Sequence, residues 1–293
     1  MPELPEVETV RLGLAPVLVG RLLARVENRR ADLRFALPDK FVERLTGTTV
    51  VSLNRRAKYL IAELSSGEAL VMHLGMTGRF TISRSGAPEI IGMYDRETGA
   101  DGKHDHIVFH TGDDHVVTYN DPRRFGFMLL VKSADLAAHA MFAGMGPEPL
   151  GPEFDAAYLA ARAMGKKVNL KSLLMDQRVI AGLGNIYVCE ALFCADLSPL
   201  RPAKSLCARN GQAHTRCDKL AAAVKSVLRD AIKAGGSTLK DYRHADGKSG
   251  LYQKTFRVYD RADEPCLRPG CSGIIKRIVQ TGRSTFYCPK CQK

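Results

Sequence analysis

Pro2 is the residue of this chain whose position allows the most unusual chemistry. An initiator Met is normally removed when a small residue follows it, and removal of Met1 would leave Pro2 with a secondary amine at the chain terminus. An α-amino group has a pKa near ~8, against about 10.4 for lysine, so a usable fraction is uncharged at pH 7. A neutral amine can attack a sugar C1′ carbon and form an iminium ion. Glu3 adjoins this amine and a helix follows, which sets Pro2 apart from a proline that merely begins a chain.

Four cysteines near the end of the chain have the spacing of a metal site. The pattern is C-x4-C, sixteen residues, then C-x2-C. Two close pairs that bracket a short hairpin bring four sulfur atoms to the corners of a tetrahedron, as structural zinc requires. Disulfides are the alternative, but we expect an unsecreted protein in a reducing compartment. The sequence therefore predicts one structural Zn²⁺ bound by Cys266, Cys271, Cys288 and Cys291, and inert thiols at Cys189, Cys194, Cys207 and Cys217.

Charge and hydropathy narrow the possible partners. Lysine and arginine total 43 and aspartate and glutamate total 31, which gives a net charge of +12. A charge so far from zero favours a polyanionic partner. No apolar run approaches the 18 residues of a membrane span, and the acidic start of the chain does not resemble a signal peptide. We therefore expect no membrane partner and a cytoplasmic location.

The elements that must position these residues begin with a helix and continue as strands. Apolar residues recur at helical spacing over residues 4–18, so an amphipathic helix begins beside Pro2 and Glu3. From there to about residue 132, short apolar runs alternate with turn residues and predict a β-sandwich or barrel. The expected strands include 58–64, 68–74, 107–110, 116–120 and 127–131, with a polar surface excursion at 83–103.

The second half of the chain is helical and ends in the cysteine hairpin. Residues 144–152 carry three prolines and three glycines and are typical of a linker. Helical patterns follow at 154–164, 169–175, 186–194 and around 220–232. The expected fold class is therefore α+β, with an N-terminal β-sandwich behind an opening helix and a C-terminal helical domain that ends in a zinc-bound β-hairpin.

Motifs spread along the chain carry a resemblance to a known family. They are PELPEVET at 2–9, RRAKYL at 55–60, HLGM at 73–76, KHDH at 103–106, DPRRFG at 121–126 and GLGNIY at 182–187. In this order they resemble the formamidopyrimidine-DNA glycosylases, nearly from end to end. The first cysteine pair departs from the family, which often has C-x2-C where LRPG intervenes here at 267–270. This spacing is still within the range of zinc sites and changes only the local loop.

The resemblance implies a domain order. We expect a β-sandwich catalytic domain, a linker, a helix–two-turn–helix DNA-binding domain, a flexible lesion-side loop and a zinc finger. The expected boundaries are 1–132, 133–152, 153–236, 237–255 and 256–293.

The resemblance also implies catalytic residues. Pro2 matches the nucleophile of the family, and Glu3 matches the acid that acts on the deoxyribose during base release. Lys58 matches a lysine assigned to proton transfer in β-elimination, and strand alternation would put it on one face with Arg56. Arg283 lies at the tip of the finger hairpin, where the family has an arginine assigned to δ-elimination. For Glu6, the family's acidic position and helix N-terminal electrostatics are equally good explanations.

Three residues match the group that fills the gap left by an extruded base. A flipped nucleotide leaves a hole in the duplex and an unpaired partner base. An apolar wedge can fill the hole, and an arginine can hydrogen-bond the exposed base edge. In the family, residues that match Met76, Arg123 and Phe125 do this.

Other positions match DNA contacts more simply. Arg124 reads as a phosphate contact, as do Arg55 and Arg56. The resemblance implies DNA binding by His104, Lys167 and Asn185, whereas His106 reads as structural. Lys171 could bind DNA or be a surface charge.

The resemblance implies a DNA repair enzyme of base excision repair. It would be a bifunctional DNA glycosylase and abasic-site lyase that removes 8-oxoguanine and formamidopyrimidines from double-stranded DNA. The chemistry would use a Schiff base at the N-terminal proline, then β,δ-elimination. We expect a monomer in the bacterial cytoplasm, associated with the nucleoid through DNA.

Two other functions compete with this interpretation. An endonuclease VIII-type glycosylase prefers oxidised pyrimidines, but Leu4 in the opening motif and the set Met76, Arg123 and Phe125 favour purines. A non-catalytic lesion-binding protein would not need the intact Pro2, Glu3 and Lys58.

Overall fold

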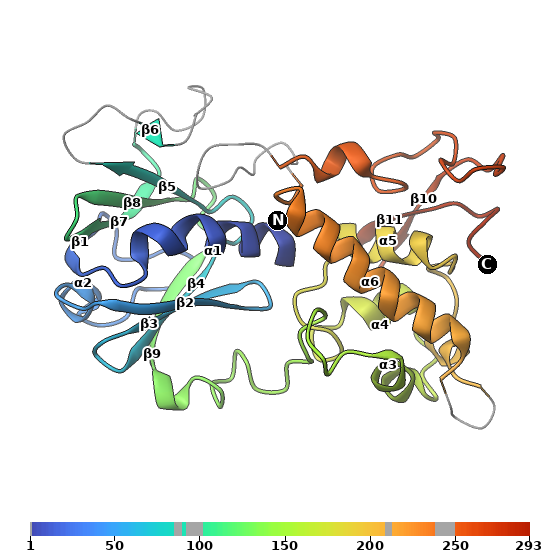
Figure 1. Ribbon diagram of the computed structural model, residues 1–293, viewed down its shortest axis with the longest axis horizontal. Helices are drawn as coiled ribbons and strands as arrows, with labels where there is room; N and C mark the ends of the chain where they lie inside the picture. The colour runs from blue at the N-terminus through green and yellow to red at the C-terminus, as the bar shows by residue number, and fades with distance from the viewer. Residues whose placement is uncertain (1, 85–89, 92–101, 209–212, 238–249) are drawn as a thin grey trace. The chain divides into compact units, whose positions relative to one another are not determined.

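The computed structural model has two compact units, which we describe separately (Figure 1). It describes residues 2–84, 90–91, 102–208, 213–237 and 250–293. The first unit comprises Met1–Ala143 and Ala234–Gln253, and the second comprises Gly144–Lys233 and Lys254–Lys293. Among the described residues, none of the helices combines the length and the hydropathy needed to cross a bilayer. The α+β class predicted from the sequence is confirmed.

The first unit opens with helix α1, Leu4–Leu18, which matches the predicted helix. Pro5 suits its first turn because the backbone N–H that proline lacks would have no partner within the helix there. Glu3 is the N-cap and Glu6 occupies the third helical position, so the two form a capping box. The apolar face of α1 is buried through Leu4, Val7, Val10, Leu14 and Leu18.

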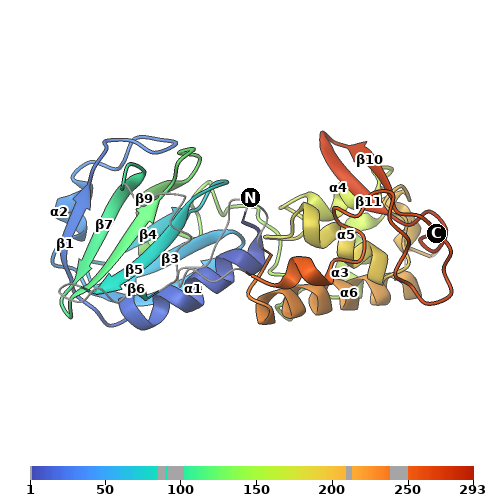
Figure 2. The same cartoon turned by 90° about the horizontal axis from the view of Figure 1, so that it is seen from above.

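Two antiparallel sheets form the predicted sandwich, which is seen from a second direction in Figure 2. One has the order β1-β7-β8-β5-β6, with bounds Leu23–Asn28, Asp105–Thr111, His115–Asn120, Arg79–Arg84 and Ile90–Ile91. The other has the order β2-β3-β4-β9, with bounds Val50–Arg56, Tyr59–Leu64, Glu68–His73 and Phe127–Lys132. Side chains from both sheets and from α1 meet in one hydrophobic core, which contains Leu14, Leu60, Phe80, Val117 and Met128. Helix α2, Phe41–Leu45, adds to it, and a short 3-10 helix, Ser133–Asp135, follows β9.

The five strands named from the sequence correspond to β3, β4, β7, β8 and β9, and the prediction was wrong at Lys58. Strand β2 ends at Arg56 and β3 begins at Tyr59, and these two residues pair across the hairpin. Lys58 therefore lies in the two-residue turn and not on a strand face beside Arg56. Ala57 has φ +52°, a left-handed backbone that a turn of this kind requires and that alternation of side chains does not reveal.

The second unit is built around helix α5, Asn185–Cys194, which is buried on nearly all sides. Helices α4 (Leu170–Met175) and α6 (Thr215–Lys233) contact α5, and α3 (Ala156–Ala163) packs against α6. The sequence predicted each of these helices. Short 3-10 helices span Ala203–Leu206 and Tyr252–Thr255. The chain closes with the hairpin of β10, Lys276–Gln280, and β11, Arg283–Tyr287.

The finger hairpin and α5 share one hydrophobic core. Cys189 and Phe193 of α5 pack with Ile275, Phe286 and Cys288 of the finger. The metal-site cysteines are thus part of the packing of the helical unit. Most of the excursion at 83–103 and of the loop at 237–255 lies outside the described residues.

Candidate functional site

The start of α1 is buried and fixed by the carboxylate of Glu6. Pro2 is buried, and Glu3 and Glu6 are only 4% and 2% exposed. Glu6 Oε2 accepts the backbone N–H of Glu3 at 2.9 Å. Its other oxygen, Oε1, accepts the N–H of Ser237 at 2.8 Å and the Ser237 hydroxyl at 3.0 Å. Glu6 therefore does more than complement the helix dipole, because it joins the N-terminus to a segment far along the chain.

That segment is a narrow stem formed by residues 234–237 and 250–252. The N–H of Leu251 donates to Ala234 O at 3.1 Å, and the N–H of Tyr252 donates to Gly236 O at 3.0 Å. Gly236 has φ +76°, and a Cβ there would lie 2.9 Å from Glu6 Oε1. Only glycine lets the stem approach the carboxylate so closely.

Lys58 occupies a turn that Arg55 supports. The Arg55 guanidinium donates to Ala57 O at 2.9 Å and to Glu8 Oε2 at 2.9 Å, and its side chain is 10% exposed. The phosphate contact of Arg55 stays a prediction, while in the structure its guanidinium pairs with Glu8. The ion pair ties the Lys58 turn to α1.

His73 lies close to this turn and stays uncharged. Burial, and then the charges of Lys58 and Arg34, lowers the pKa of His73 from 6.5 to about 4. Its Nδ1 accepts the N–H of Gly75 at 3.0 Å, and its ring stacks on Phe127 with centroids 5.2 Å apart. A neutral His73 thus anchors the turn that carries Met76.

The next turn is organised by the fully buried carboxylate of Asp121. Oδ1 accepts the hydroxyl of Thr77 at 2.5 Å, whereas Oδ2 accepts the N–H of Gly126 at 2.8 Å and the Tyr119 hydroxyl at 3.2 Å. Burial, and then the charge of Asp121, raises the pKa of Tyr119 well above its usual range, so its hydroxyl remains a donor. A side chain at Gly75 or Gly126 would collide with the facing turn, so both glycines permit this close packing.

These turns present the predicted wedge residues together. Met76 is 37% exposed and Phe125 is 41% exposed, although both are large and apolar. The Arg123 guanidinium lies 4.8 Å from the centre of the Phe125 ring. Arg124, with φ +54°, points elsewhere and pairs with Asp32 at 3.6 Å.

The two histidines of the KHDH motif also meet Asp121. The backbone carbonyl of His104 accepts the N–H of Asp121 at 3.0 Å, while its side chain is half-buried. The ring of His106 is buried and bonds Asp121 O through Nε2 at 2.9 Å. The structural interpretation of His106 is confirmed.

In the second unit, Gln177 shapes the loop before α5. Its side chain accepts the N–H of Gly182 at 2.8 Å and donates to Leu183 O at 2.9 Å. Gly184 is the N-cap of α5, and Asn185 follows as the first helical residue. The loop that leads into α5 is thus fixed by Gln177, a residue that the motif alone did not single out. Lys167 lies on the segment before α4 and is exposed.

Asn185 and Lys171 both donate hydrogen bonds to the finger hairpin. Asn185 Nδ2 donates to Ser284 O at 2.9 Å. Lys171 is fully buried, and its Nζ donates to Ser284 O at 2.9 Å and to Thr285 Oγ1 at 2.6 Å. Of the two interpretations of Lys171, the surface charge is wrong, because the residue is fully buried. Arg283 is exposed at the start of β11.

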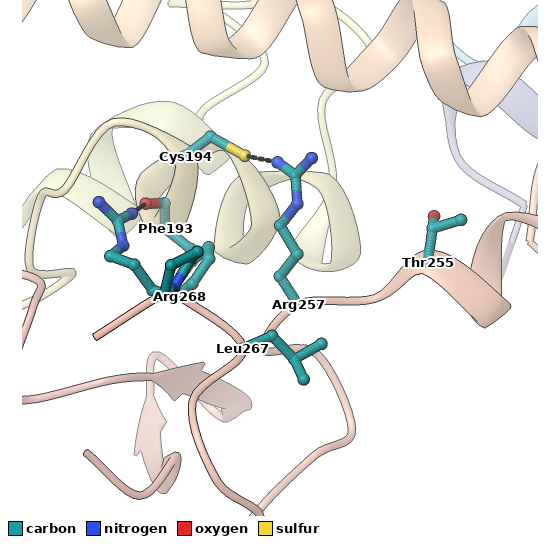
Figure 3. A pocket seen from close by; sticks show the side chains of 7 residues that line it. Phe193, Cys194, Thr255, Arg257, Leu267 and Arg268 are labelled. Carbon is teal, nitrogen blue, oxygen red and sulfur yellow. Dashed lines mark hydrogen bonds between the residues drawn. The ribbon is translucent and has the colours of Figure 1, made fainter. Parts of the chain in front are cut away.

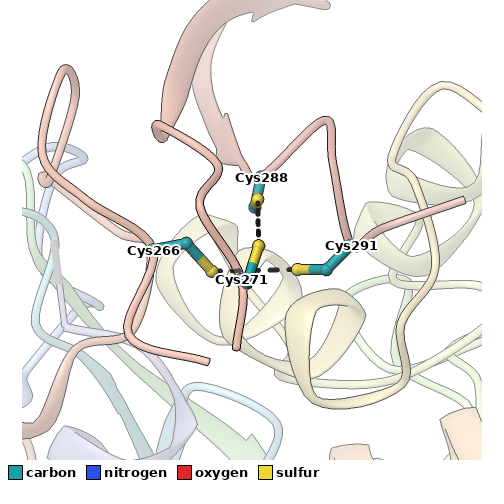
Figure 4. Close-up of side chains that lie close together, drawn as sticks. All are labelled: Cys266, Cys271, Cys288 and Cys291. Carbon is teal, nitrogen blue, oxygen red and sulfur yellow. Dashed lines mark hydrogen bonds between the residues drawn. The ribbon is translucent and has the colours of Figure 1, made fainter. Parts of the chain in front are cut away.

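The four predicted zinc ligands converge (Figure 4). All four sulfur atoms lie within 4.8 Å of one another, with Sγ···Sγ distances of 3.8 Å for Cys266–Cys291 and 3.7 Å for Cys271–Cys288. A tetrahedral Zn²⁺ with Zn–S bonds near 2.3 Å needs S···S edges of about 3.8 Å. A Cβ at Gly273 would lie 2.5 Å from Cys288 Sγ, so the glycine leaves room for the cluster. The site therefore fits one structural zinc.

The altered finger loop borders a pocket of about 390 Å³ (Figure 3). The lining residues are Phe193, Cys194, Thr255, Arg257, Leu267, Arg268 and Pro269. An Arg257 Nη atom donates to Cys194 Sγ at 2.5 Å, and an Arg268 Nη atom donates to Phe193 O at 2.7 Å. Burial raises the pKa of the Cys194 thiol, which keeps it protonated and unreactive. None of the predicted catalytic or DNA-contact residues lines this pocket.

Family models cover most of the chain. The formamidopyrimidine-DNA glycosylase N-terminal domain matches residues 1–128, its H2TH domain matches 145–243, and the zinc finger found in FPG and IleRS matches 263–293. The chain belongs to the formamidopyrimidine-DNA glycosylase family. The glycosylase of Phenylobacterium zucineum (strain HLK1) is 56% identical over all 293 residues, and that of Rhodopseudomonas palustris (strain BisB18) is 54% identical, with both chains covered completely in each case.

Solved structures of glycosylases agree with this assignment. The complex of the Lactococcus lactis Fpg with DNA that contains an abasic site matches with a TM-score of 0.84 and 32% identity, over the whole of both chains. The MutM (Fpg) protein of Thermus thermophilus matches with a TM-score of 0.80 and 36% identity, over 99% of this chain and 98% of that one. The resemblance seen in the sequence motifs is therefore confirmed.

The state of His73 gives a first testable prediction. Because the folded pKa is about 4 and the unfolded value about 6.5, stabilisation by neutral His73 is complete above pH 6.5 and is lost as the pH falls to 4. His73→Asn keeps an acceptor for Gly75 and removes the titration. In urea unfolding experiments, the free energy of unfolding should rise between pH 4 and 7.5. The rise should be up to about 3 kcal/mol larger for wild type than for the variant. Parallel curves for the two proteins would contradict the buried neutral state.

The shared core gives a second prediction. Cys288→Ala removes a zinc ligand from the core that contains Phe193, so it should abolish zinc binding and lower the melting temperature of the second unit. Metal analysis and calorimetry measure both effects. Cys194→Ala, a thiol outside the cluster, is the matched control and should retain one zinc. Undiminished zinc in the Cys288 variant would show that this sulfur is not a ligand.

Proposed function

We propose that this chain excises oxidised purines, 8-oxoguanine and formamidopyrimidines, from double-stranded DNA and then cleaves the abasic site. It is a bifunctional DNA glycosylase and DNA lyase of base excision repair, as its family membership implies. The observation that carries the proposal is the buried Pro2, which gains a secondary amine when Met1 is removed, beside a buried Glu3 at the fixed start of α1.

The reaction begins at the Pro2 amine. Its lone pair attacks C1′ of the damaged nucleotide as the bond to the base breaks, and the departing base takes up the proton that the amine loses. Glu3 protonates the ring oxygen O4′ while the C1′–O4′ bond breaks, which opens the deoxyribose. The product is an iminium ion between Pro2 and the sugar. Lys58 transfers a proton during β-elimination, which breaks the bond to the 3′ phosphate. Arg283 serves the second, δ-elimination, which breaks the bond to the 5′ phosphate.

The exposed wedge residues fill the gap that an extruded nucleotide leaves in the duplex. Met76 and Phe125 are apolar and exposed, and such side chains can enter a base stack when a nucleotide is extruded. Arg123 lies over Phe125 and can hydrogen-bond the orphan base.

Phosphate binding involves groups from both units. Arg124, His104 and Lys167 supply cations or donors to the backbone of the DNA. Asn185 contributes through its place at the start of α5, where the positive end of the helix dipole favours an anion. A bound zinc would make the hairpin rigid, held by the four cysteines, and takes no part in the chemistry.

We further propose the biological setting. The enzyme works as a monomer on lesion-containing DNA in the bacterial cytoplasm, where it associates with the nucleoid. Its domains are a catalytic sandwich at 1–132, a linker at 133–152, a helix–two-turn–helix domain at 153–236, a lesion-side loop at 237–255 and a zinc finger at 256–293.

Borohydride trapping tests the nucleophile. Reduction during the reaction with an 8-oxoguanine duplex should join the protein covalently to DNA through the N-terminal peptide, because only an iminium ion is reduced to a stable amine. Peptide mapping by mass spectrometry locates the adduct. A variant with Met1 retained has no free Pro2 amine and should give no adduct. An adduct at Lys58 instead would overturn the role of Pro2.

Substitution of the two neighbouring arginines should have different effects on the ratio of excision opposite cytosine to excision opposite adenine. A bidentate hydrogen-bonded pair contributes about 1–3 kcal/mol of discrimination between bases. Arg123→Ala should therefore erode a preference for lesions opposite cytosine over adenine, whereas Arg124→Ala should weaken binding without changing the ratio. Single-turnover excision on both duplexes gives the ratios. Our assignment is wrong if Arg123→Ala keeps the wild-type ratio or if Arg124→Ala alone changes it.

A further inference from the structure

The carbonyl of Ser284 receives two buried hydrogen-bond donors from two different helices. Lys171 of α4 and Asn185 of α5 each place a nitrogen 2.9 Å from it. Ser284 adjoins Arg283, the residue that begins β11 after the hairpin turn. All of these groups belong to the second unit, so the arrangement is internal to it.

The geometry of the hairpin explains why this carbonyl needs a partner. Gln280 and Arg283 flank a two-residue turn, and Val279 and Ser284 form the next pair. In an antiparallel ladder, hydrogen-bonded and non-hydrogen-bonded pairs alternate. The N–H and C=O groups of Ser284 therefore point away from β10, and the side chains of α4 and α5 occupy that outer edge of β11.

Burial of the Lys171 ammonium at this edge costs free energy. Its residue is 0% exposed, and a buried ammonium loses hydration that only well-placed acceptors replace. Its Nζ reaches both Ser284 O and the hydroxyl of Thr285, which is also fully buried, at 2.9 and 2.6 Å. Two charge-assisted hydrogen bonds to consecutive residues fix both the position and the rotation of the strand.

The opposite strand has its own anchor. Gln280, at the end of β10, donates from Nε2 to Pro199 O at 3.3 Å. The turn between the strands has positive φ at Thr281 and Gly282, which is unusual for a β-branched threonine. A tip with this backbone depends on anchors at its base to present one conformation.

We propose that Lys171 is a positioning residue for Arg283. It holds β11 at Ser284 and Thr285 so that the Arg283 guanidinium is presented in one place for the second elimination. This inference rests on the role of Arg283 proposed above. The chemical consequence is selective: loss of Lys171 slows δ-elimination and spares the steps assigned to Pro2, Glu3 and Lys58.

The test separates the two eliminations on a duplex with a preformed abasic site. Under single-turnover conditions, denaturing gels resolve the β-product from the β,δ-product. Lys171→Met should slow the conversion of the first to the second about 10- to 100-fold, the cost of a small misplacement, with β-elimination within about twofold of wild type. Equal slowing of both steps, or of neither, would overturn the proposal.

A control variant at Lys225 and a second variant at Thr285 test whether the effect of Lys171→Met is specific to the hairpin. Lys225→Met removes a lysine–carbonyl hydrogen bond to Gly151 O in the same unit, far along the chain from the hairpin, and should leave both eliminations unchanged. Zinc content and melting temperature report folding. If Lys171→Met loses zinc, Thr285→Val carries the decision, because it removes one hydrogen bond at nearly constant volume. It should slow δ-elimination alone, and an unchanged rate would refute the proposal.

An Arg283→Ala arm distinguishes this inference from its premise. A normal δ-elimination rate in that variant would refute the role of Arg283 itself. A slow rate in Arg283→Ala together with a normal rate in Lys171→Met would leave that role intact and refute only the positioning by Lys171.

Discussion

A reactive amine at the end of a chain has a covalent neighbour on one side only, so hydrogen bonds must fix its position. The carboxylate of Glu6 supplies them through its bond to the N–H of Glu3 at 2.9 Å and its bonds to Ser237 on the other oxygen. Two segments that would otherwise be independent are thus joined at one buried group. The helix start, the adjoining Glu3 and the stem at 234–237 and 250–252 all depend on this carboxylate, because a buried charge without its donors would be strongly destabilising.

The same principle recurs at each turn that carries a proposed functional residue. Asp121 organises the turns of Met76 and Arg123, Arg55 supports the turn of Lys58, and Lys171 anchors the strand of Arg283. In every case the supporting group is a charged side chain with little or no exposure, bonded to backbone atoms or hydroxyls. Rigid turns can therefore present exposed side chains such as Phe125, whose own packing would not hold them in place.

Local patterns predicted the elements and the metal site well but missed these supports. The helix at 4–18, the hairpins and the convergence of the four cysteines follow from periodicity and spacing, which act over a few residues. The burial of Lys171 depends on Ser284, 113 residues away, and could not be read from a basic residue among other basic residues. The turn at Lys58 was missed because alternation of side chains does not report the positive φ of Ala57. The roles of the proposed site residues come from the motif resemblance, since their types alone have commonplace explanations.

The bond between Glu6 and Ser237 spans 231 residues, and this separation constrains the protein's biosynthesis. At typical rates of about 5–20 residues per second, a ribosome needs about 10–50 s to make the intervening chain. Throughout that interval the Glu6 carboxylate has emerged without its distant partner, while the helices at 156–233 are still being made. The first unit is completed only after most of the second has been translated, so premature termination anywhere before Ser237 leaves the first unit without its closing contact.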